Sequence, residues 1–316
     1  YRSRDERLIA FSDRHFYQRL VTFPGVGREP PVRLVHVADE GGDDPDSGSA
    51  EVRRVVDLVL EHARTRPGES LGVIALGIPH ATRLQAAMDS AAAEHPELAA
   101  FFDESREDRF FVKNLERVQG DERDAILLSV GYRRGRDGKL RYFFGPLSQQ
   151  GGERRLNVAV TRARRRMTVV STFTHLDMDA GRARSLGVQL LRAYLEYCAG
   201  GGDRAGGEGA QPADAFESAM REALAAQGVP VVAQWGVGSR RVALAASGAS
   251  EPGFVMAIEP DGAAYGADRD ARDRDRLHAQ QLESLGWRFV RSWSSDWMHR
   301  AEAEAARLVA AWHAAD

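Results

Sequence analysis

The sequence has 316 residues, 28% of them charged, and a formal net charge of -3. This length predicts two domains, and the near balance of charge excludes bulk positive charge as the basis of any nucleic-acid binding, so such a surface must be local. The single cysteine, Cys198, excludes an internal disulfide framework, and no apolar run reaches the roughly 20 residues of a membrane helix, which favours a cytoplasmic protein without a membrane partner.

The first half of the chain alternates between helical and strand patterns. A helix with a Ser3-to-Glu6 capping box is expected near the start. Strands at 32–37 and 71–76 and helices at 52–63 and 80–93 then predict a parallel sheet covered on both faces. An acidic, Gly-rich stretch at 41–49 is expected to be a mobile loop. Ligands bind such sheets at the carboxyl ends of strands, where the turns at 77–80 and 120–122 are expected.

Two features near the middle of the chain have alternative interpretations. The phenylalanine pairs at 110–111 and 143–144 could stack on bases or belong to the core. A basic, hairpin-like loop could follow a phosphate backbone or be an ordinary solvated loop. The basic residues of that loop are Arg133, Arg134, Arg136, Lys139 and Arg141.

The stretch 153–166, ERRLNVAVTRARRR, is the most informative part of the sequence. Read as one helix, it places Arg155, Arg162 and Arg166 on one face, while Leu156 and its apolar neighbours face a core. An apolar strand at 167–170 follows. An arginine-rich solvated helix is one interpretation, but phosphate is the partner that best suits several planar guanidinium groups.

This stretch and the segment 112–129, VKNLERVQGDERDAILLS, resemble motifs V and VI of superfamily-1 helicases, in the branch that includes the nonsense-mediated-decay helicase and its bacterial relatives. The Tyr-Arg pair at the chain start resembles a third motif. The resemblance implies adenine stacking by the tyrosine, γ-phosphate contacts from two arginines and a ribose contact from a glutamate. The residues assigned to ATP are Tyr1, Arg2, Gln119, Gly120, Glu122, Arg155 and Arg162, with Arg162 as the arginine finger.

The sequence lacks the motif that would bind the ATP phosphates from the other side of the nucleotide. No G-x-x-x-x-G-K-[ST] motif occurs, and the nearest string, GRDGKL at 135–140, has the wrong spacing and no hydroxyl for magnesium. The chain is therefore expected to be a fragment that supplies a second RecA-like domain. It would share ATP and Mg²⁺ with a preceding RecA-like domain of the same protein and would not hydrolyse ATP alone.

A Gly-rich stretch separates the first domain from a smaller α/β tail. The tail is expected to contain a helix at 215–227, three strands at 231–234, 241–246 and 254–259, a helix at 271–285, a strand at 287–293 and a terminal helix. The expected domains are thus a second RecA-like domain at 1–198, a flexible linker at 199–213 and a nuclease-like domain at 214–316.

The tail resembles very-short-patch-repair-like endonucleases of the PD-(D/E)XK class, through IEPDG at 258–262 and LGWRFVRSWSSDW at 285–297. The resemblance implies that Glu217, Glu259 and Asp261 are the site acids, with Glu259 and Asp261 as ligands of Mg²⁺ or Mn²⁺ if the site works. Ala243 stands where the family has the central aspartate, and Gly266 where a histidine is usual. A degenerate nuclease fold kept for DNA binding or docking is therefore expected.

The sequence as a whole favours an α/β fragment of a DNA helicase with a fused nuclease-like domain, acting on single-stranded DNA or a duplex junction. Foreign-DNA defence or repair is the expected setting by analogy. Two alternatives stay open. The chain could be a non-catalytic nucleic-acid-binding or docking module, or the tail could be an active metal-dependent endonuclease.

Overall fold

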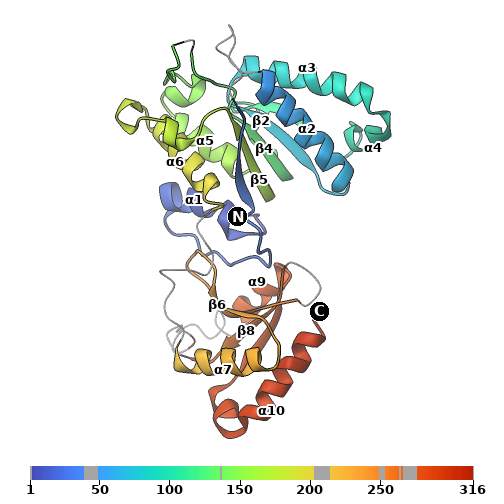
Figure 1. Ribbon diagram of the computed structural model, residues 1–316, viewed down its shortest axis with the longest axis vertical. Helices are drawn as coiled ribbons and strands as arrows, with labels where there is room; N and C mark the ends of the chain where they lie inside the picture. Colours follow the sequence, from blue (N-terminus) through green and yellow to red (C-terminus); the bar gives the residue numbers. More distant parts are fainter. Residues whose placement is uncertain are drawn as a thin grey trace. The chain divides into compact units, whose positions relative to one another are not determined.

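The computed structural model describes residues 2–38, 49–135, 137–202, 214–248, 253–262, 265 and 276–315 (Figure 1). The chain forms two compact units. Unit 1 comprises Tyr1–Ser3 and Pro31–Gly202, and unit 2 comprises Arg4–Pro30 and Asp203–Asp316. The expected first domain, 1–198, differs from unit 1 at Arg4–Pro30, which pack with the tail. Most of the expected linker, 203–213, lies outside the described residues, as does the acidic loop at 41–48.

Unit 1 is built on a five-stranded, fully parallel sheet with the order β1-β5-β4-β2-β3. The predicted parallel α/β sheet is therefore confirmed. The three central strands have mostly buried side chains, because helices cover both faces of the sheet. The strands are β1 Val32–His36, β2 Leu71–Ala75, β3 Phe111–Asn114, β4 Arg123–Ser129 and β5 Ala163–Ser171.

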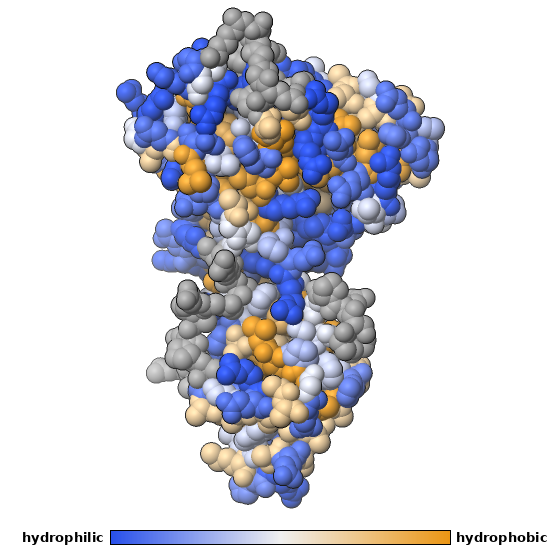
Figure 2. All heavy atoms as spheres, in the orientation of Figure 1, coloured by the Kyte–Doolittle hydropathy of each residue, from blue (hydrophilic) through white to orange (hydrophobic). Residues whose placement is uncertain are grey.

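Helices α2 and α3 lie on one side of this sheet, and α5 and α6 lie on the other (Figure 1). Leu58, Leu84 and Leu127 belong to the core cluster between the first pair and the strands. Hydrophilic residues dominate the visible surface of unit 1, with apolar residues in smaller groups (Figure 2). The helices are α2 Ser49–Thr65, α3 Ile78–Glu94, α4 Ala99–Phe102, α5 Gly152–Val160 and α6 Leu186–Ala199. No helix in the described ranges is both long and apolar enough to cross a membrane.

The single helix predicted over 153–166 is wrong. Helix α5 ends at Val160, and β5 begins at Ala163, so the last three arginines of the stretch belong to a strand. Strand β5 pairs with β1 on one side and β4 on the other. Pairing with β4 begins at Ala163, and pairing with β1 begins at Met167. These backbone hydrogen bonds outweigh the helical spacing of the arginines, because strand pairing is a tertiary effect that local periodicity does not contain.

The turn at 120–122 lies at the opposite edge of the sheet from the expected one. It precedes β4, at the amino end of that strand, whereas the turn at 77–80 follows β2 at its carboxyl end. Because all five strands run parallel, the residues that precede β3, β4 and β5 gather at one edge. We call this the amino edge of the sheet; the carboxyl edge is the opposite one.

Unit 2 contains a four-stranded sheet with the order β6-β7-β8-β9, in which only β8 and β9 are parallel. The elements follow the predicted order, and residues 271–275 of the expected helix lie outside the described residues. Helices α7 and α10 pack against one another. The elements are α7 Ala215–Ala226, β6 Val231–Trp235, β7 Val242–Ser247, β8 Phe254–Pro260, α9 His278–Ser284, β9 Arg288–Ser292 and α10 Ser294–His313.

The segment Arg4–Pro30 is an integral part of unit 2. The indole nitrogen of Trp235 donates to the carbonyl of Gly25 at 3.1 Å, and that of Trp287 donates to the carbonyl of Pro24 at 2.8 Å. The buried Glu6 carboxylate accepts hydrogen bonds from the backbone of the turn after β6. The predicted capping box at Ser3 is wrong, because Asp5 caps the first turn. Short turns follow: Glu6–Leu8, α1 Ala10–Ser12 and Asp13–Tyr17.

Candidate functional site

Arg162 lies at the amino edge, between the end of α5 and the start of β5. Its backbone carbonyl accepts a hydrogen bond from the amide of Arg123 at 3.1 Å, which ties the starts of β5 and β4 together. Its guanidinium donates to the carbonyl of Val158 at 2.8 Å, the carbonyl of Asp121 at 3.4 Å and the hydroxyl of Thr161 at 3.0 Å. These acceptors are neutral, so they hold the guanidinium group in place without neutralising its charge.

Arg2 reaches the same turn from the start of the chain. Its guanidinium forms an ion pair with the Glu122 carboxylate at 2.8 Å, and its side chain is 78% exposed. Two of the arginines assigned to ATP, Arg2 and Arg162, therefore meet at the turn Asp121–Glu122. Tyr1 lies outside the described residues.

The remaining described residues that were predicted to bind ATP are Gln119, Gly120 and Arg155. Gln119 and Gly120 are exposed, and Gly120 has a φ of 90°, a backbone conformation that favours glycine. The guanidinium of Arg155 donates to the carbonyl of Gln150 at 3.1 Å. The structure thus shows no contact of these three residues that singles out a role.

Arg164 is a neighbour of this turn that the sequence reasoning missed. Its guanidinium contacts Asp108 at 2.5 Å, lies 3.5 Å from Asp124 and 3.9 Å from Glu122. Arg164 belongs to β5, while its partners come from the segment before β3, the turn before β4 and the start of β4 itself. Only the strand order brings these groups together, so the arginine run in the sequence contained no sign of which residue would meet acids.

A cleft of about 750 Å³ adjoins the turn on the side of the edge strand β3. Six carboxylates and three basic residues line it, so it is an unfavourable place for a polyphosphate. The side of the turn that carries Arg2 and Arg162 suits phosphate better. The charged lining residues of the cleft are Asp89, Glu104, Glu107, Asp108, Asp121, Glu122, Arg109, Lys113 and Arg123.

The acids predicted for the nuclease-like site divide into two groups. Glu217 on α7 is 6% exposed and accepts a hydrogen bond from Gln234 at 2.9 Å. Its pKa is raised first by burial and further by the charges of Asp214 and Glu259. Glu259 on β8 accepts a hydrogen bond from the amide of Ala243 at 3.1 Å. Glu217, Ala243 and Glu259 are therefore neighbours.

Asp261 has a different contact. Its carboxylate accepts hydrogen bonds from the amide and the hydroxyl of Ser294, the latter at 3.0 Å, in the first turn of α10. It therefore serves as a helix cap, a role that the sequence reasoning missed. Within the described parts of the chain, no three His, Cys, Asp or Glu side chains gather closely enough to hold a metal ion.

Two further neighbours of the nuclease-like acids were also missed. Gln234 has a φ of 53° in β6, and this positive φ accompanies the interrupted pairing between Ala233 and Trp235 opposite β7. His278 on α9 lies 3.8 Å from the Glu259 carboxylate. A backbone irregularity of this kind has no sequence signal when the residue is not glycine.

His80 is a buried residue with a structural role. Its Nε2 lies 2.7 Å from the hydroxyl of Ser129, which donates at 2.6 Å to the carboxylate of Glu51. Burial and then the charge of Arg83 lower the pKa of His80 to about 3. The group lies at the carboxyl edge, away from the turn that holds Arg162.

Comparison with known families agrees with this two-part architecture. Residues 26–174 match a family model described as an AAA domain, and residues 216–312 match the restriction-endonuclease-like family REase_MTES_1575. The chain is therefore similar to an AAA domain in its first part and to a restriction-endonuclease-like family in its second part.

Two curated relatives are similar to the chain over 204 residues at 35% identity. They are named the uncharacterized ATP-dependent helicase MG140 of Mycoplasma genitalium and its homolog in Mycoplasma pneumoniae. The match covers 63% of this chain but only 18% of each relative.

Solved structures are more distant. The C-terminal domain of a possible DNA helicase from Lactobacillus plantarum aligns at 16% identity with a TM-score of 0.31, over 54% of this chain and 86% of that one. The helicase HrpB from Escherichia coli aligns at 13% identity with a TM-score of 0.26, over 94% of this chain and 43% of that one.

Proposed function

We propose that this chain is the carboxy-terminal part of an ATP-dependent superfamily-1 DNA helicase and supplies its second RecA-like domain. The observation that carries the proposal is the meeting of Arg162 and Arg2 at the turn Asp121–Glu122, on one edge of a parallel sheet. The identity to relatives named ATP-dependent helicases supports the same function. The cytoplasm is the proposed location.

In this mechanism Arg162 is the γ-phosphate arginine. Its present acceptors are two carbonyls and a hydroxyl, and an anionic phosphate is a stronger partner for a guanidinium than a neutral oxygen. Arg2 would leave Glu122 for the phosphate, which frees that carboxylate for the ribose hydroxyls. A correctly placed arginine accelerates phosphoryl transfer by about 10³ to 10⁵.

Bound ATP with Mg²⁺ supplies the reactive phosphate and part of the charge that stabilises its transfer. The sequence has no phosphate-binding loop of the G-x-x-x-x-G-K-[ST] type. The preceding RecA-like domain of the same protein would therefore hold the nucleotide from the other side, and the two domains would close on a DNA strand when ATP binds.

Replacement of Arg162 in the full-length protein tests this function. Arg162→Ala should lower DNA-stimulated ATP hydrolysis by about 10³ or more with little change in DNA affinity, because the arginine acts on the transition state. Arg154→Ala is the matched control, since Arg154 lies on α5, the helix that ends two residues before Arg162, and has an 87% exposed side chain. This variant should leave the rate unchanged. Unchanged hydrolysis in Arg162→Ala would instead favour a non-catalytic binding or docking module.

We propose for unit 2 a very-short-patch-repair-like nuclease fold that binds or docks on DNA without cutting it. Ala243 offers no metal ligand between Glu217 and Glu259, and Asp261 is engaged with Ser294. Foreign-DNA defence or DNA repair is the setting we propose for the fusion. An active metal-dependent endonuclease is the alternative.

Restoring the central acid tests the nuclease-like fold. In Ala243→Asp three carboxylates would converge, so Mn²⁺ should raise the thermal midpoint of the variant by about 5 °C or more. The chain with Ala243 should show no such shift, and the double variant Ala243→Asp/Glu259→Ala should lose it. Metal-dependent cleavage of DNA by the unaltered chain, abolished by Glu259→Ala, would establish the active endonuclease.

A further inference from the structure

The loop after β4 presents an unusual pair of aromatic neighbours at the carboxyl edge. Phe144 is fully buried and its ring packs 5.2 Å from the ring of Tyr132 and 5.8 Å from that of Phe173. Phe143 is 66% exposed. Of the two phenylalanines that the sequence offered as a pair, one anchors the loop to the core and the other remains at the surface.

The backbone around Phe143 is held on both sides. The amide of Phe144 donates to the hydroxyl of Ser148 at 2.8 Å, and that hydroxyl donates to the carbonyl of Tyr142 at 3.3 Å. The phenolic oxygen of Tyr142 accepts a hydrogen bond from the amide of Asp179 at 2.5 Å. These bonds fix the direction of Phe143, so its ring is exposed without being on a loose loop.

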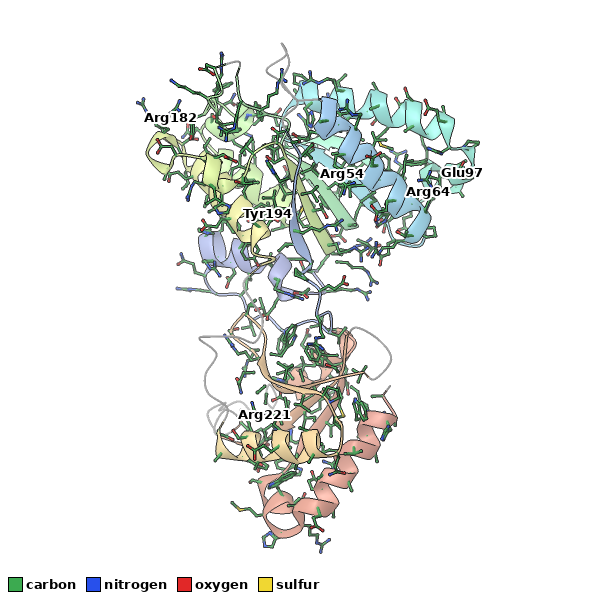
Figure 3. The ribbon with its side chains drawn as sticks, viewed as in Figure 1. Arg54, Arg64, Glu97, Arg182, Tyr194 and Arg221 are labelled. Carbon is green, nitrogen blue, oxygen red and sulfur yellow. The ribbon has the colours of Figure 1, made fainter. Side chains whose placement is uncertain are left out.

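Two segments supply basic side chains next to Tyr142 or within a few residues of Phe143 in the sequence. Arg182, labelled in Figure 3, comes from the turn Ala180–Arg182, and its guanidinium lies 4.6 Å from the ring centre of Tyr142. From the basic loop, Lys139 and Arg141 are exposed. The short bridge between Arg134 and Leu140 makes this loop a hairpin; Arg136 lies outside the described residues.

The acids of this region are already engaged. Asp177 pairs with Arg134 at 2.5 Å, Asp179 accepts from the amide of Gly181 at 2.8 Å, and Asp137 accepts from the amide of Lys139 at 3.1 Å. The described basic side chains of the two segments outnumber these three acids. They are Arg133, Arg134, Lys139, Arg141, Arg182 and Arg184.

We propose that Phe143, Tyr142, Lys139, Arg141 and Arg182 form a contact surface for single-stranded DNA, with Phe143 stacking on a base. A fixed, exposed aromatic ring beside phosphate-binding cations is the combination that sequence-tolerant binding of a single strand requires. A duplex hides the faces of its bases, so the exposed ring favours a single strand. This inference rests on the proposed helicase function and places the strand at the carboxyl edge, opposite the edge with Arg162.

The test measures the anisotropy of a labelled oligothymidylate of about 16 nucleotides with the 316-residue chain, without ATP, at about 50 to 200 mM salt. Phe143→Ala should weaken binding roughly 5- to 150-fold with an unchanged salt slope, because stacking releases no counterions. Lys139→Ala should instead reduce the slope by about 1. Phe143→Trp should retain the affinity, and its fluorescence should be quenched by the oligonucleotide.

Met298→Ala is the control, because Met298 is 84% exposed in unit 2 and belongs to no part of the surface. Affinity of Phe143→Ala within about twofold of the parent would overturn the stacking role. Equal loss of duplex and single-strand binding, or no measurable single-strand binding by the parent, would also overturn the inference. None of these outcomes affects the Arg162→Ala test, so failure here is distinguishable from failure of the helicase function.

Discussion

Glu51 is a carboxylic acid with no exposed surface in the middle of unit 1. One oxygen accepts hydrogen bonds from the hydroxyl of Ser129 at 2.6 Å and the amide of Gly131 at 2.8 Å. Within the parts of the chain that the structure describes, its other oxygen has no hydrogen-bond partner. Burial raises the pKa of Glu51 from 4.5 to about 7, and the hydrogen bonds offset only part of that effect.

This pKa makes the stability of unit 1 depend on pH. Because the folded pKa lies above the unfolded one, the folded state binds the proton more tightly, and stability falls as pH rises from about 4.5 to about 7. The loss should be about 3 kcal/mol, since a tenfold difference in proton affinity between the folded and unfolded states corresponds to about 1.4 kcal/mol. Urea unfolding at a pH below this range and at a pH above it measures the loss in free energy of unfolding. The parent chain should show the loss, and Glu51→Gln should not.

Glu61→Gln is the matched control, because Glu61 is exposed on the same helix. It should keep the pH dependence of the parent chain. If Glu51→Gln kept it as well, the titrating group would have to be another residue.

At the scale of elements, α5 positions Arg155 and Arg162 and is held by a close backbone contact. A Cβ atom on Gly152 would lie 2.3 Å from the carbonyl oxygen of Leu147, and one on Gly187 would lie 2.3 Å from the same oxygen. Packing therefore requires both glycines, because the first residues of α5 and α6 approach the backbone of the turn Gly145–Ser148, which contains Leu147.

Gly152→Ala should force α5 away from Leu147 and destabilise the chain by about 1–3 kcal/mol. The shift should also lower ATP hydrolysis in the full-length protein, because it displaces Arg162. Gly68→Ala is the control: a Cβ there meets no atom within 4 Å, so stability should be unchanged or slightly higher. Thermal unfolding of the two variants distinguishes them, and equal midpoints would exclude the close contact as the constraint.

At the scale of the whole molecule, unit 2 is assembled from two distant parts of the chain. The amide of Phe254 donates to the carbonyl of Val26 at 2.9 Å, and Phe23 and Val26 pack on a cluster that includes Trp235 and Trp287. The segment Arg4–Pro30 precedes the whole parallel sheet in sequence. Unit 2 therefore cannot be completed by its carboxy-terminal residues alone.

Cleavage of the chain between the two units tests this assembly. With a protease site introduced within 203–213, the pieces 1–202 and 203–316 should co-elute after cleavage, because Arg4–Pro30 packs against the tail. They should separate in urea. Trp287→Ala, which removes the indole that contacts Pro24, should weaken the association. Separation of the two pieces in native buffer, without that substitution, would contradict the assembly.

The sequence by itself determined most of the strands and helices, because their apolar runs and alternation are local and survive in any packing. Strand β3, Phe111–Asn114, was not among the expected strands. Two predictions for unit 1 were wrong, and both for reasons of tertiary structure. Arg164–Arg166 became strand because β4 offered backbone partners from Ala163 to Arg166. The turn before β4 lay at the amino edge because the strand direction placed it there.

Only the tertiary structure decided which charged groups meet. Arg2 contacts Glu122 and Arg164 contacts Asp108 across long stretches of chain, and Asp261 caps α10 although its motif suggested a metal ligand. Likewise, Arg4–Pro30 joins unit 2. A sequence specifies the chemistry of each side chain and its local conformation, whereas long-range partners depend on strand order and packing, which arise only when the whole chain folds.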